Sequence, residues 1–148
     1  MERASLIMLR GLPASGKTTV AENFISNNTN CVRLNRDSLR NMMYFACKGN
    51  SLISGNQENG VIVVQRSAAI ELLNEGFSVI IDDTNVEQKH YNRWKEIADI
   101  TESDFLVYSL LETVNIEECI RRDAEREDGV GEDAIINLAR RADILNRK

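Results

Sequence analysis

Proline, histidine, cysteine and long apolar runs are all scarce in this 148-residue sequence. It has one proline, one histidine and three cysteines. Cys31, Cys47 and Cys119 are widely separated and form no CxxC pair, so we expect neither a disulfide framework nor a zinc site. No apolar run approaches the roughly 18 residues that a membrane-spanning helix needs. The opening residues, MERASLIML, also lack the layout of a signal peptide, and we therefore expect a cytoplasmic protein.

A basic excess is missing as well. The chain carries 18 Lys and Arg against 23 Asp and Glu, a net charge of −5. Proteins that coat nucleic acid without sequence preference usually carry a positive net charge, because it displaces counterions from the phosphates. The arginines are nevertheless clustered, as at Arg33, Arg36 and Arg40. The charge therefore argues against a coating protein but leaves room for a local basic cleft.

Hydrophobic patterning predicts a regular alternation of strands and helices. Short apolar runs bounded by polar residues or glycine indicate strands at 6–9, 31–34, 77–81 and 104–111. Helical spacing indicates helices from about residue 16, at 37–46, 57–76 and 87–99, and from residue 115 onward except for a break at 129–131. Residues 47–59 are rich in Gly, Asn and Ser and are expected to form a loop. This order predicts an α/β fold, with a parallel sheet covered by helices on both faces, in a single domain at 1–148.

The segment GLPASGKT, residues 11–18, satisfies the pattern GxxxxGK[ST] between an expected strand and an expected helix. Its glycines let the backbone wrap a phosphate, and the helix that follows adds the positive end of its dipole. Lys17 is then placed to reach the β- and γ-phosphates, and the Thr18 hydroxyl to bind Mg²⁺. ATP is favoured over GTP because no NKxD-like sequence is present. The phosphate-binding residues that this P-loop predicts are Gly11, Pro13, Ala14, Ser15, Gly16, Lys17, Thr18 and Thr19.

Polar segments follow the second and third expected strands, LNRDSLR at 34–40 and DDTN at 82–85. The carboxyl ends of parallel strands share one edge of a sheet, so both segments should converge with the P-loop on one crevice. One of the two acids in the second segment, Asp82 or Asp83, would lie beside the metal ion. Asp37 either caps a helix or accepts the proton of an attacking hydroxyl, and Arg40, one turn later, is placed to hold an acceptor's phosphate.

In order and separation, GLPASGKTT, NRDSLR, DDTN and CIRRDAER resemble the kinase domain of phage polynucleotide 5′-kinases of the P-loop superfamily. The resemblance implies an adenylate-kinase-like P-loop fold with a short helical lid at about 121–133. It implies three catalytic residues: Asp37 as general base, Lys17 on the phosphates and Arg126 as the lid arginine. It also implies Thr18 and Asp83 on the metal.

The remaining site residues follow from the same motifs. Arg122 and Arg126 are four residues apart on an expected helix, so they would face the same way as an anion clamp needs. Pairing of these arginines with nearby acidic residues is the alternative. The expected acceptor-binding set is Asn35, Arg36, Asp37, Arg40, Asp83, Thr84 and Asn85.

The nature of the acceptor stays open in the sequence. The chain has no room for the second, phosphatase domain of well-known family members, and DGVGED replaces the Val-Pro that often follows the lid. We expect ATP- and Mg²⁺-dependent phosphorylation of the 5′-hydroxyl end of a polynucleotide, with DNA preferred to RNA. The close alternative is the hydroxymethyl group of 5-hydroxymethyluracil in phage DNA. A small-molecule kinase and a slow nucleotide-hydrolysing switch are more distant alternatives, and strandedness and homo-oligomerisation are left open.

Overall fold

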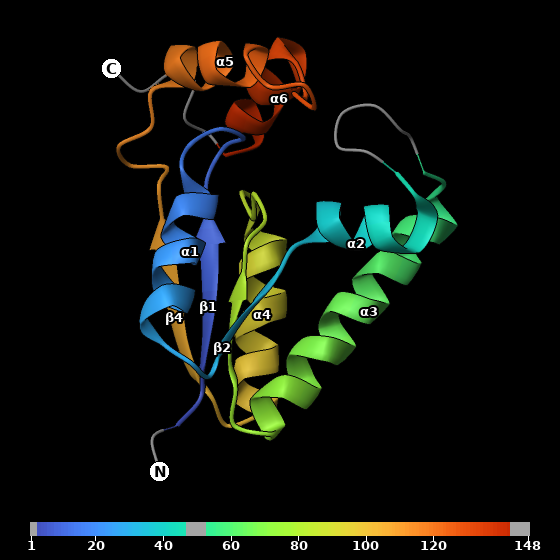
Figure 1. The fold of residues 1–148 in the computed structure, drawn as a ribbon, viewed down its shortest axis with the longest axis vertical. Helices are drawn as coiled ribbons and strands as arrows, with labels where there is room; N and C mark the ends of the chain where they lie inside the picture. The colour runs from blue at the N-terminus through green and yellow to red at the C-terminus, as the bar shows by residue number, and fades with distance from the viewer. Residues whose placement is uncertain (1–2, 47–52, 143–148) are drawn as a thin grey trace.

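Four parallel strands form one sheet, in the order β2-β3-β1-β4, in the computed structural model of this chain (Figure 1). The structure describes residues 3–46 and 53–142. The strands are β1 (Ser5–Arg10), β2 (Cys31–Leu34), β3 (Ser78–Ile81) and β4 (Asp104–Ser109). The helices are α1 (Lys17–Asn27), α2 (Arg36–Tyr44), α3 (Gly55–Asn74), α4 (Gln88–Ile100), α5 (Ile116–Ala124) and α6 (Glu132–Arg141). The expected α/β class and the order of its elements are confirmed.

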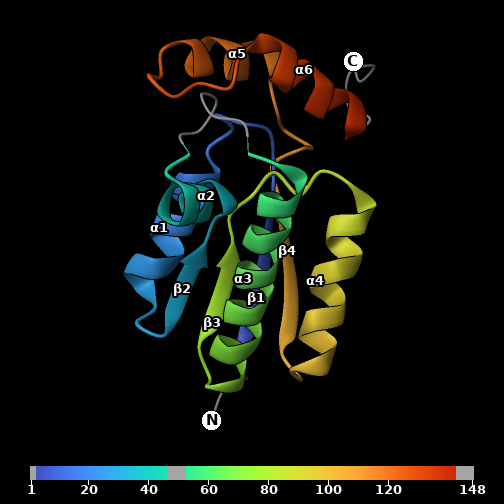
Figure 2. The same cartoon turned by 90° about the vertical axis from the view of Figure 1, so that its right-hand side faces the viewer.

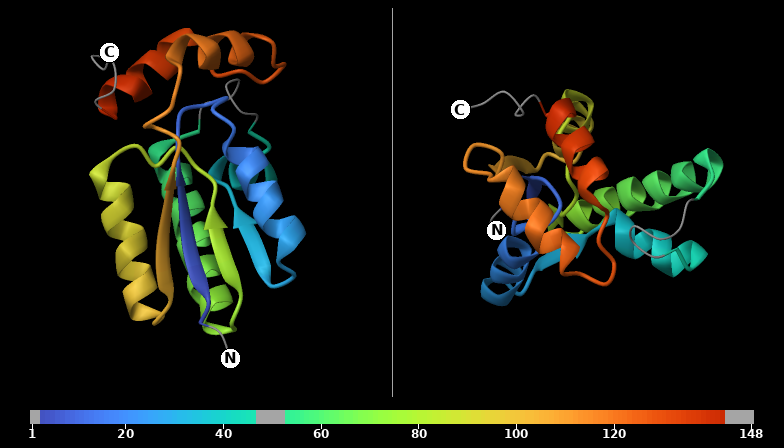
Figure 3. Two further views of the ribbon diagram at one scale, coloured as in Figure 1. Left: turned by 90° about the vertical axis from the view of Figure 1, so that its left-hand side faces the viewer. Right: turned by 90° about the horizontal axis from the view of Figure 1, so that it is seen from above.

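Both faces of the sheet are buried at its central strand β1, whose side chains alternate between two apolar clusters. Leu6 and Met8 pack with side chains of α3 and α4, including Trp94, on one face. Ile7 and Leu9 pack with side chains of α1 on the other. Figures 2 and 3 show these two faces. Burying each such side chain stabilises the fold by about 1.5–3 kcal/mol, so the apolar runs of the sequence specify the sheet.

The strand order creates a crevice at the carboxyl edge of the sheet. The chain passes from β1 to the outer strand β2, returns to β3 beside β1, and then crosses to β4 on the opposite side of β1. Connections leaving β1 and β3 therefore diverge, which is where open α/β sheets bind ligands. Backbone contacts join the segments there, since Gly11 N donates to Thr84 O at 3.0 Å. The predicted convergence of the polar segments is confirmed.

The boundary between the expected loop and α3 is wrong. Residues 47–52, including Cys47, lie outside the described residues, but α3 begins at Gly55, two residues before the expected start at residue 57 and within the expected loop at 47–59. A capping box starts it, in which Gln57 N donates to Ser54 Oγ at 3.1 Å and Ser54 N donates to Gln57 Oε1 at 2.9 Å. This Ser-x-x-Gln signal was present in a Gly- and Asn-rich stretch whose composition alone indicates a loop.

Helices α5 and α6 lie across the carboxyl edge of the sheet, as Figure 1 shows, and the segment 116–141 that they span is called the lid below. Their apolar side chains pack with Leu12 of the P-loop. The turn between them is held by the buried Asp123 carboxylate, which accepts the backbone N–H groups of Val130 at 2.9 Å and Gly131 at 2.8 Å. The lid thus contacts the P-loop directly. None of the described helices, in the lid or elsewhere, combines the length and apolar character needed to cross a bilayer.

Candidate active site

The P-loop has the tight backbone turn that its sequence predicts. Gly16, which precedes α1, has a φ of 103°, a left-handed conformation that glycine adopts without strain. A Cβ at Gly11 would lie 2.6 Å from Ser15 Oγ, so a larger residue there would displace the Ser15 side chain inside the loop. Lys17 Nζ donates to Leu12 O at 2.9 Å across the loop. The backbone therefore encloses a small cradle at the positive end of a helix, as phosphate binding requires.

A cavity of about 700 Å³ opens beside this cradle. Six of the eight predicted phosphate-binding residues line it: Pro13, Ala14, Gly16, Lys17, Thr18 and Thr19. Gly11 and Ser15 shape the turn instead of lining the cavity. Ser15 Oγ is buried and has no hydrogen-bond partner within the described residues. A bound polyphosphate would fit this site. It would lie at the positive end of α1, beside Lys17, and could accept a hydrogen bond from the Ser15 hydroxyl.

Of the two acids at the end of β3, Asp82 is the one that lies beside Thr18, whereas the sequence alone led us to expect Asp83 on the metal. Thr18 Oγ1 donates to Asp82 Oδ2 at 3.4 Å, and Arg33 Nε donates to the same oxygen at 2.6 Å. A hydroxyl and a carboxylate are the hard oxygen ligands that Mg²⁺ prefers. Thr18 and Asp82 could therefore hold the ion at the phosphate side of the cavity.

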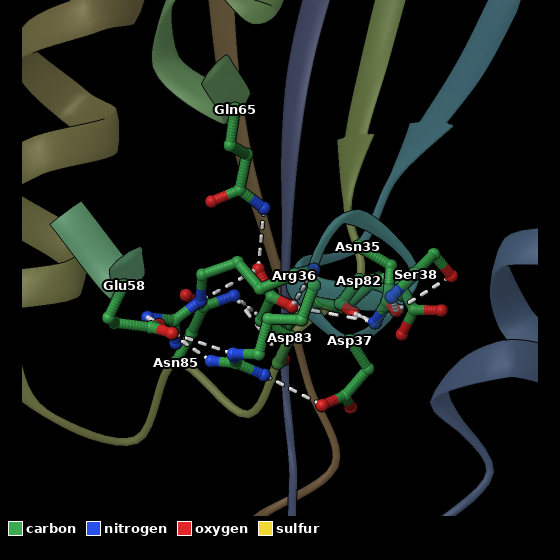
Figure 4. A network of polar contacts seen from close by, with 11 residues as sticks. Asn35, Arg36, Asp37, Ser38, Glu58, Gln65, Asp82, Asp83 and Asn85 are labelled. Atoms are coloured by element: carbon green, nitrogen blue, oxygen red, sulfur yellow. Dashed lines mark hydrogen bonds and ion pairs between the residues drawn. The ribbon is translucent and has the colours of Figure 1, made fainter. Parts of the chain in front are cut away.

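Asp83 also lines the cavity, but it is buried and both of its oxygens have partners in the fold. Its Oδ1 accepts Arg36 N at 2.9 Å, and its Oδ2 accepts Gln65 Nε2 at 2.7 Å. Burial raises the pKa of the Asp83 carboxyl, while the Arg36 charge opposes that shift. The carboxylate ties α2 and α3 to the end of β3, and Figure 4 shows it enclosed among these partners. Asp83 is therefore part of the cavity wall and is held by contacts within the protein.

Two asparagines expected in the acceptor site also have structural roles. Asn35 is the N-cap of α2, since its Oδ1 accepts Ser38 N at 2.9 Å and its Nδ2 donates to Asp82 O at 2.6 Å. Asn85 is buried, with a φ of 47°, and donates to Leu9 O at 2.8 Å. Neither amide is free for a substrate. Because Asn35 caps α2, the capping alternative for Asp37 is wrong.

Asp37 projects from the first turn of α2 (Figure 4) and forms an ion pair with Arg40 of the next turn. Arg40 Nη1 donates to Asp37 Oδ1 at 2.7 Å. Its other edge is held by Glu58 of α3, because Nε donates to Oε2 and Nη2 donates to Oε1, both at 2.7 Å. The hydrogen bonds between them raise the pKa of Arg40 and lower the pKa of Glu58, so this pair is charged at neutral pH. Asp37 and Arg40 both line the cavity, together with Arg36 and Thr84.

The lid arginines differ from the expectation. Arg126 lines the cavity, but it lies beyond the end of α5 at Ala124, so it does not share a helix face with Arg122. Arg122 Nε donates to Glu118 Oε1 at 2.9 Å, and its Nη1 reaches Ala14 O at 3.5 Å. The acidic-pairing alternative therefore holds for Arg122. Asp128 of the lid also lines the cavity.

Two polar residues of the site escaped sequence reasoning: Glu58 and Gln65. Gln65 had a usable signal, because it occupies one position of the buried stripe Val61, Gln65, Ala69 and Leu73 along α3. A polar side chain on such a stripe must find a buried partner. Glu58 gave no such signal, since it is a partly exposed charged residue.

These parts together define a P-loop protein of the kinase type, with a phosphate cradle, a strand-end acid and a lid over one cavity. The chain belongs to the family described as an AAA domain, whose model matches residues 6–147. A search of curated proteins gives no match to this sequence.

Solved structures give further similarities. A chain in a structure of the Pnkp1/Rnl/Hen1 RNA repair complex is 28% identical over 97% of this chain, with a TM-score of 0.81. Another structure of the Pnkp1/Rnl/Hen1 complex gives 30% identity over 82% of this chain and a TM-score of 0.71. This chain covers 45% and 40% of those two chains, less than half of each. The Mycobacterium tuberculosis APS kinase CysC shares the fold, with 19% identity over 84% of this chain and 71% of its own, and a TM-score of 0.64.

Proposed function

We propose that this protein is an ATP-dependent kinase that transfers the γ-phosphoryl group of ATP to the 5′-hydroxyl end of a polynucleotide. The observation that carries the proposal is the position of Asp37 and Arg40 in the same cavity as the P-loop. A carboxylate beside a guanidinium provides a proton acceptor and an anion anchor about one helical turn apart. A 5′-terminal nucleotide of a chain offers a matching hydroxyl and phosphodiester.

In the proposed reaction the acceptor oxygen forms a bond to the γ-phosphorus while the bond to the oxygen that bridges the β-phosphate breaks. The hydroxyl proton passes to an oxygen of Asp37, and ADP leaves. Oδ2 of Asp37 is the suitable atom, because Oδ1 already accepts Arg40. In-line positioning and charge stabilisation supply most of the rate in such transfers.

On the phosphate side, Lys17 and the N–H groups at the start of α1 bind and orient the polyphosphate. Arg126, across the cavity on the lid, adds positive charge near the transferred group. Mg²⁺, when bound, would neutralise charge on the β- and γ-phosphates. Thr18 and Asp82 are the residues we assign to it, in place of the pair Thr18 and Asp83.

The similarity to a chain of an RNA repair complex supports a polynucleotide as acceptor. It also favours RNA, whereas the sequence alone led us to expect DNA. Because this chain covers less than half of that relative, the choice between the two belongs to the experiment.

One acceptor panel tests the proposal. The purified protein is incubated with Mg²⁺ and γ-labelled ATP and one acceptor at a time: 5′-hydroxyl RNA, 5′-hydroxyl DNA, end-blocked DNA containing 5-hydroxymethyluracil, free nucleosides, or no acceptor. We expect label on the 5′-hydroxyl ends, with RNA labelled faster than DNA. Label on the end-blocked modified DNA alone would transfer the assignment to a base-hydroxymethyl kinase. Label only on free nucleosides would indicate a small-molecule kinase.

Turnover of ATP without an acceptor is the remaining outcome. A rate of ATP hydrolysis that no acceptor changes would indicate a nucleotide-hydrolysing switch. It would also contradict the proposed role of Asp37, since a general base for an alcohol has no task in that reaction.

A further inference from the structure

Arg40 has five N–H donors, and the structure accounts for three of them. Nε and Nη2 each give one hydrogen to Glu58, and Nη1 gives one to Asp37. Within the described residues, one hydrogen on Nη1 and one on Nη2 remain for a further acceptor. Charged guanidinium donors of this kind form strong hydrogen bonds to phosphate oxygens. The Arg40 side chain is 25% exposed, and it lines the cavity.

Glu58 decides which edge of Arg40 remains available. It belongs to the first turn of α3, whereas Arg40 and Asp37 both belong to α2. Two parallel hydrogen bonds fix the guanidinium plane, which a single contact would leave free to rotate. Without Glu58, Arg40 would be free to turn its outer edge onto both oxygens of Asp37. That arrangement would use the donors needed for an acceptor and would occupy the carboxylate oxygen needed for a proton.

The helix that carries Glu58 is itself anchored at the acceptor wall. Gln65, two turns along α3, donates to the buried Asp83 at the end of β3. Arg36 lies between the two, with its Nη1 at 3.6 Å from Glu58 Oε1 and its Nε at 3.5 Å from Asp83 Oδ2. Figure 4 shows Glu58, Arg36, Asp83 and Asp37 in one continuous set of polar contacts. The position of Glu58 is therefore fixed by the core rather than by its exposed neighbours.

We infer that Glu58 is a positioning residue for the acceptor: it holds Arg40 in the orientation that binds the phosphodiester next to the 5′-hydroxyl and leaves one oxygen of Asp37 free. The inference rests on the proposed polynucleotide kinase activity. It assigns to α3 a part in acceptor recognition that none of the motifs indicates. Glu58 acts through Arg40 and touches no reacting atom.

A double-mutant cycle between Glu58 and Arg40 tests this inference. Glu58→Gln keeps the side-chain size but loses the charge and one of the two acceptor oxygens. We expect the KM for a 5′-hydroxyl oligonucleotide to rise about tenfold, the scale of losing a charge-assisted hydrogen bond, with the KM for ATP unchanged. In an Arg40→Ala background the same substitution should change the oligonucleotide KM by less than about twofold, because coupled residues are not additive.

The matched control is Glu71→Gln, on an exposed position of the same helix. It should leave every kinetic constant as in the parent protein. Circular dichroism and thermal unfolding identify a variant that fails to fold, and Glu58→Asp, which keeps the charge on a shorter side chain, should recover part of the acceptor affinity. A tenfold effect of Glu58→Gln that persists in the Arg40→Ala background would overturn the inference, as would an equal rise in the KM for ATP.

The cycle separates this inference from the proposed function. An unchanged oligonucleotide KM in Glu58→Gln, with a wild-type protein that labels 5′-hydroxyl ends, contradicts the positioning role alone. If the wild-type protein labels no 5′-hydroxyl end, the proposed function is contradicted. The positioning role of Glu58 then fails with it, because it depends on that function.

Discussion

The two sides of the crevice are built by different means. The proposed phosphate side consists of consecutive residues, Gly11 to Thr18, whose backbone turns tightly at the start of α1. The proposed acceptor side consists of side chains from α2, α3 and the end of β3, joined by ion pairs such as Arg40 to Glu58. The first depends on local backbone geometry and the second on long-range electrostatics. Substitutions should therefore affect the two sides in different ways.

The largest effect is expected from Asp37→Asn on the acceptor side. Loss of a general base should reduce label transfer to a 5′-hydroxyl oligonucleotide about 10³-fold. The affinity for ATP and the free energy of unfolding should stay the same, because Asn35 rather than Asp37 caps α2. Single-turnover label transfer measures the first, and chemical denaturation measures the second.

Asn35→Ala is the matched comparison for Asp37→Asn. It removes the cap of α2 and should lower the free energy of unfolding by about 1 kcal/mol. If the Asp37 substitution instead lowered stability while transfer persisted, the catalytic role would belong to another residue.

A second large effect is expected from Lys17→Ala on the phosphate side. Removing this cation should slow transfer about 10²-fold and weaken ATP binding, because Lys17 acts on the nucleotide rather than the acceptor. Label transfer at saturating ATP and titration of ATP binding separate the two changes. Lys95→Ala, at an exposed lysine of α4 paired with Asp99, is the control and should change neither. Transfer within tenfold of wild type would contradict the assignment.

The neighbouring residues Asp82 and Asp83 allow the phosphate side and the acceptor side to be compared directly, because Asp82 contacts Thr18 and Asp83 contacts Arg36. Asp82→Asn should raise the Mg²⁺ concentration for half-maximal activity about tenfold, since Asp82 lies beside Thr18. Asp83→Asn should leave the Mg²⁺ dependence unchanged and lower the free energy of unfolding by about 1–3 kcal/mol, because it disturbs a buried hydrogen-bonded group. Activity titrations with Mg²⁺ and urea denaturation measure these effects. The reverse pattern would return the metal role to Asp83.

This pair of acids also shows how far the sequence could predict the site. The pattern DDTN after an apolar run places two carboxylates at the strand end, where side-chain alternation stops being a guide to direction. The register of β3 against β1 and the hydrogen bonds from Arg36 and Gln65 decide which of the two carboxylates lies toward Thr18. Those partners are 47 and 18 residues away in the chain, and no local pattern specifies them.

The sheet and the P-loop were predictable because their determinants are local. Alternating apolar side chains such as Leu6 and Ile7 specify two buried faces, and a glycine pattern specifies the loop. On the proposed acceptor side, the motifs correctly placed Arg36, Asp37, Arg40 and Thr84 at the cavity, because these residues follow directly from strand ends. Glu58 was missed, because nothing in a sequence indicates which partly exposed glutamate will meet which arginine.

A smaller effect is expected in the lid. A Cβ at Gly129 would lie 2.4 Å from the backbone oxygen of Asp123, so Gly129→Ala should force the lid turn to shift. Overpacking of this kind costs about 1–3 kcal/mol, measurable as a lower unfolding temperature. The KM for ATP should rise while the oligonucleotide KM stays constant, because the lid packs on the P-loop. Gly55→Ala is the control, since a Cβ there meets nothing within 4 Å. An unchanged unfolding temperature in Gly129→Ala would show that the turn adapts.

The smallest effect concerns His90 of α4, whose environment reflects the positive charge of the acceptor side. Burial, and then the charges of Arg36, Arg93 and Lys89, lower the pKa of His90 to about 4, while Glu87 opposes the shift. The folded protein therefore favours neutral His90. Its contribution to stability is complete above the unfolded pKa of about 6.5 and is lost as the pH falls toward 4.

His90→Gln should reduce that pH dependence without removing the helix cap. Glu87 N donates to His90 Nδ1 at 3.3 Å, and glutamine three residues after the N-cap forms the same capping-box contact. The free energy of unfolding, measured by urea denaturation at pH 7 and pH 5, should fall less in the variant than in the wild type. Equal decreases would mean that His90 is protonated as easily in the folded chain as in the unfolded one. In that case neither the burial of His90 nor the charge of Arg36 would favour the neutral imidazole in solution, and the electrostatic influence of the proposed acceptor side would not extend to α4.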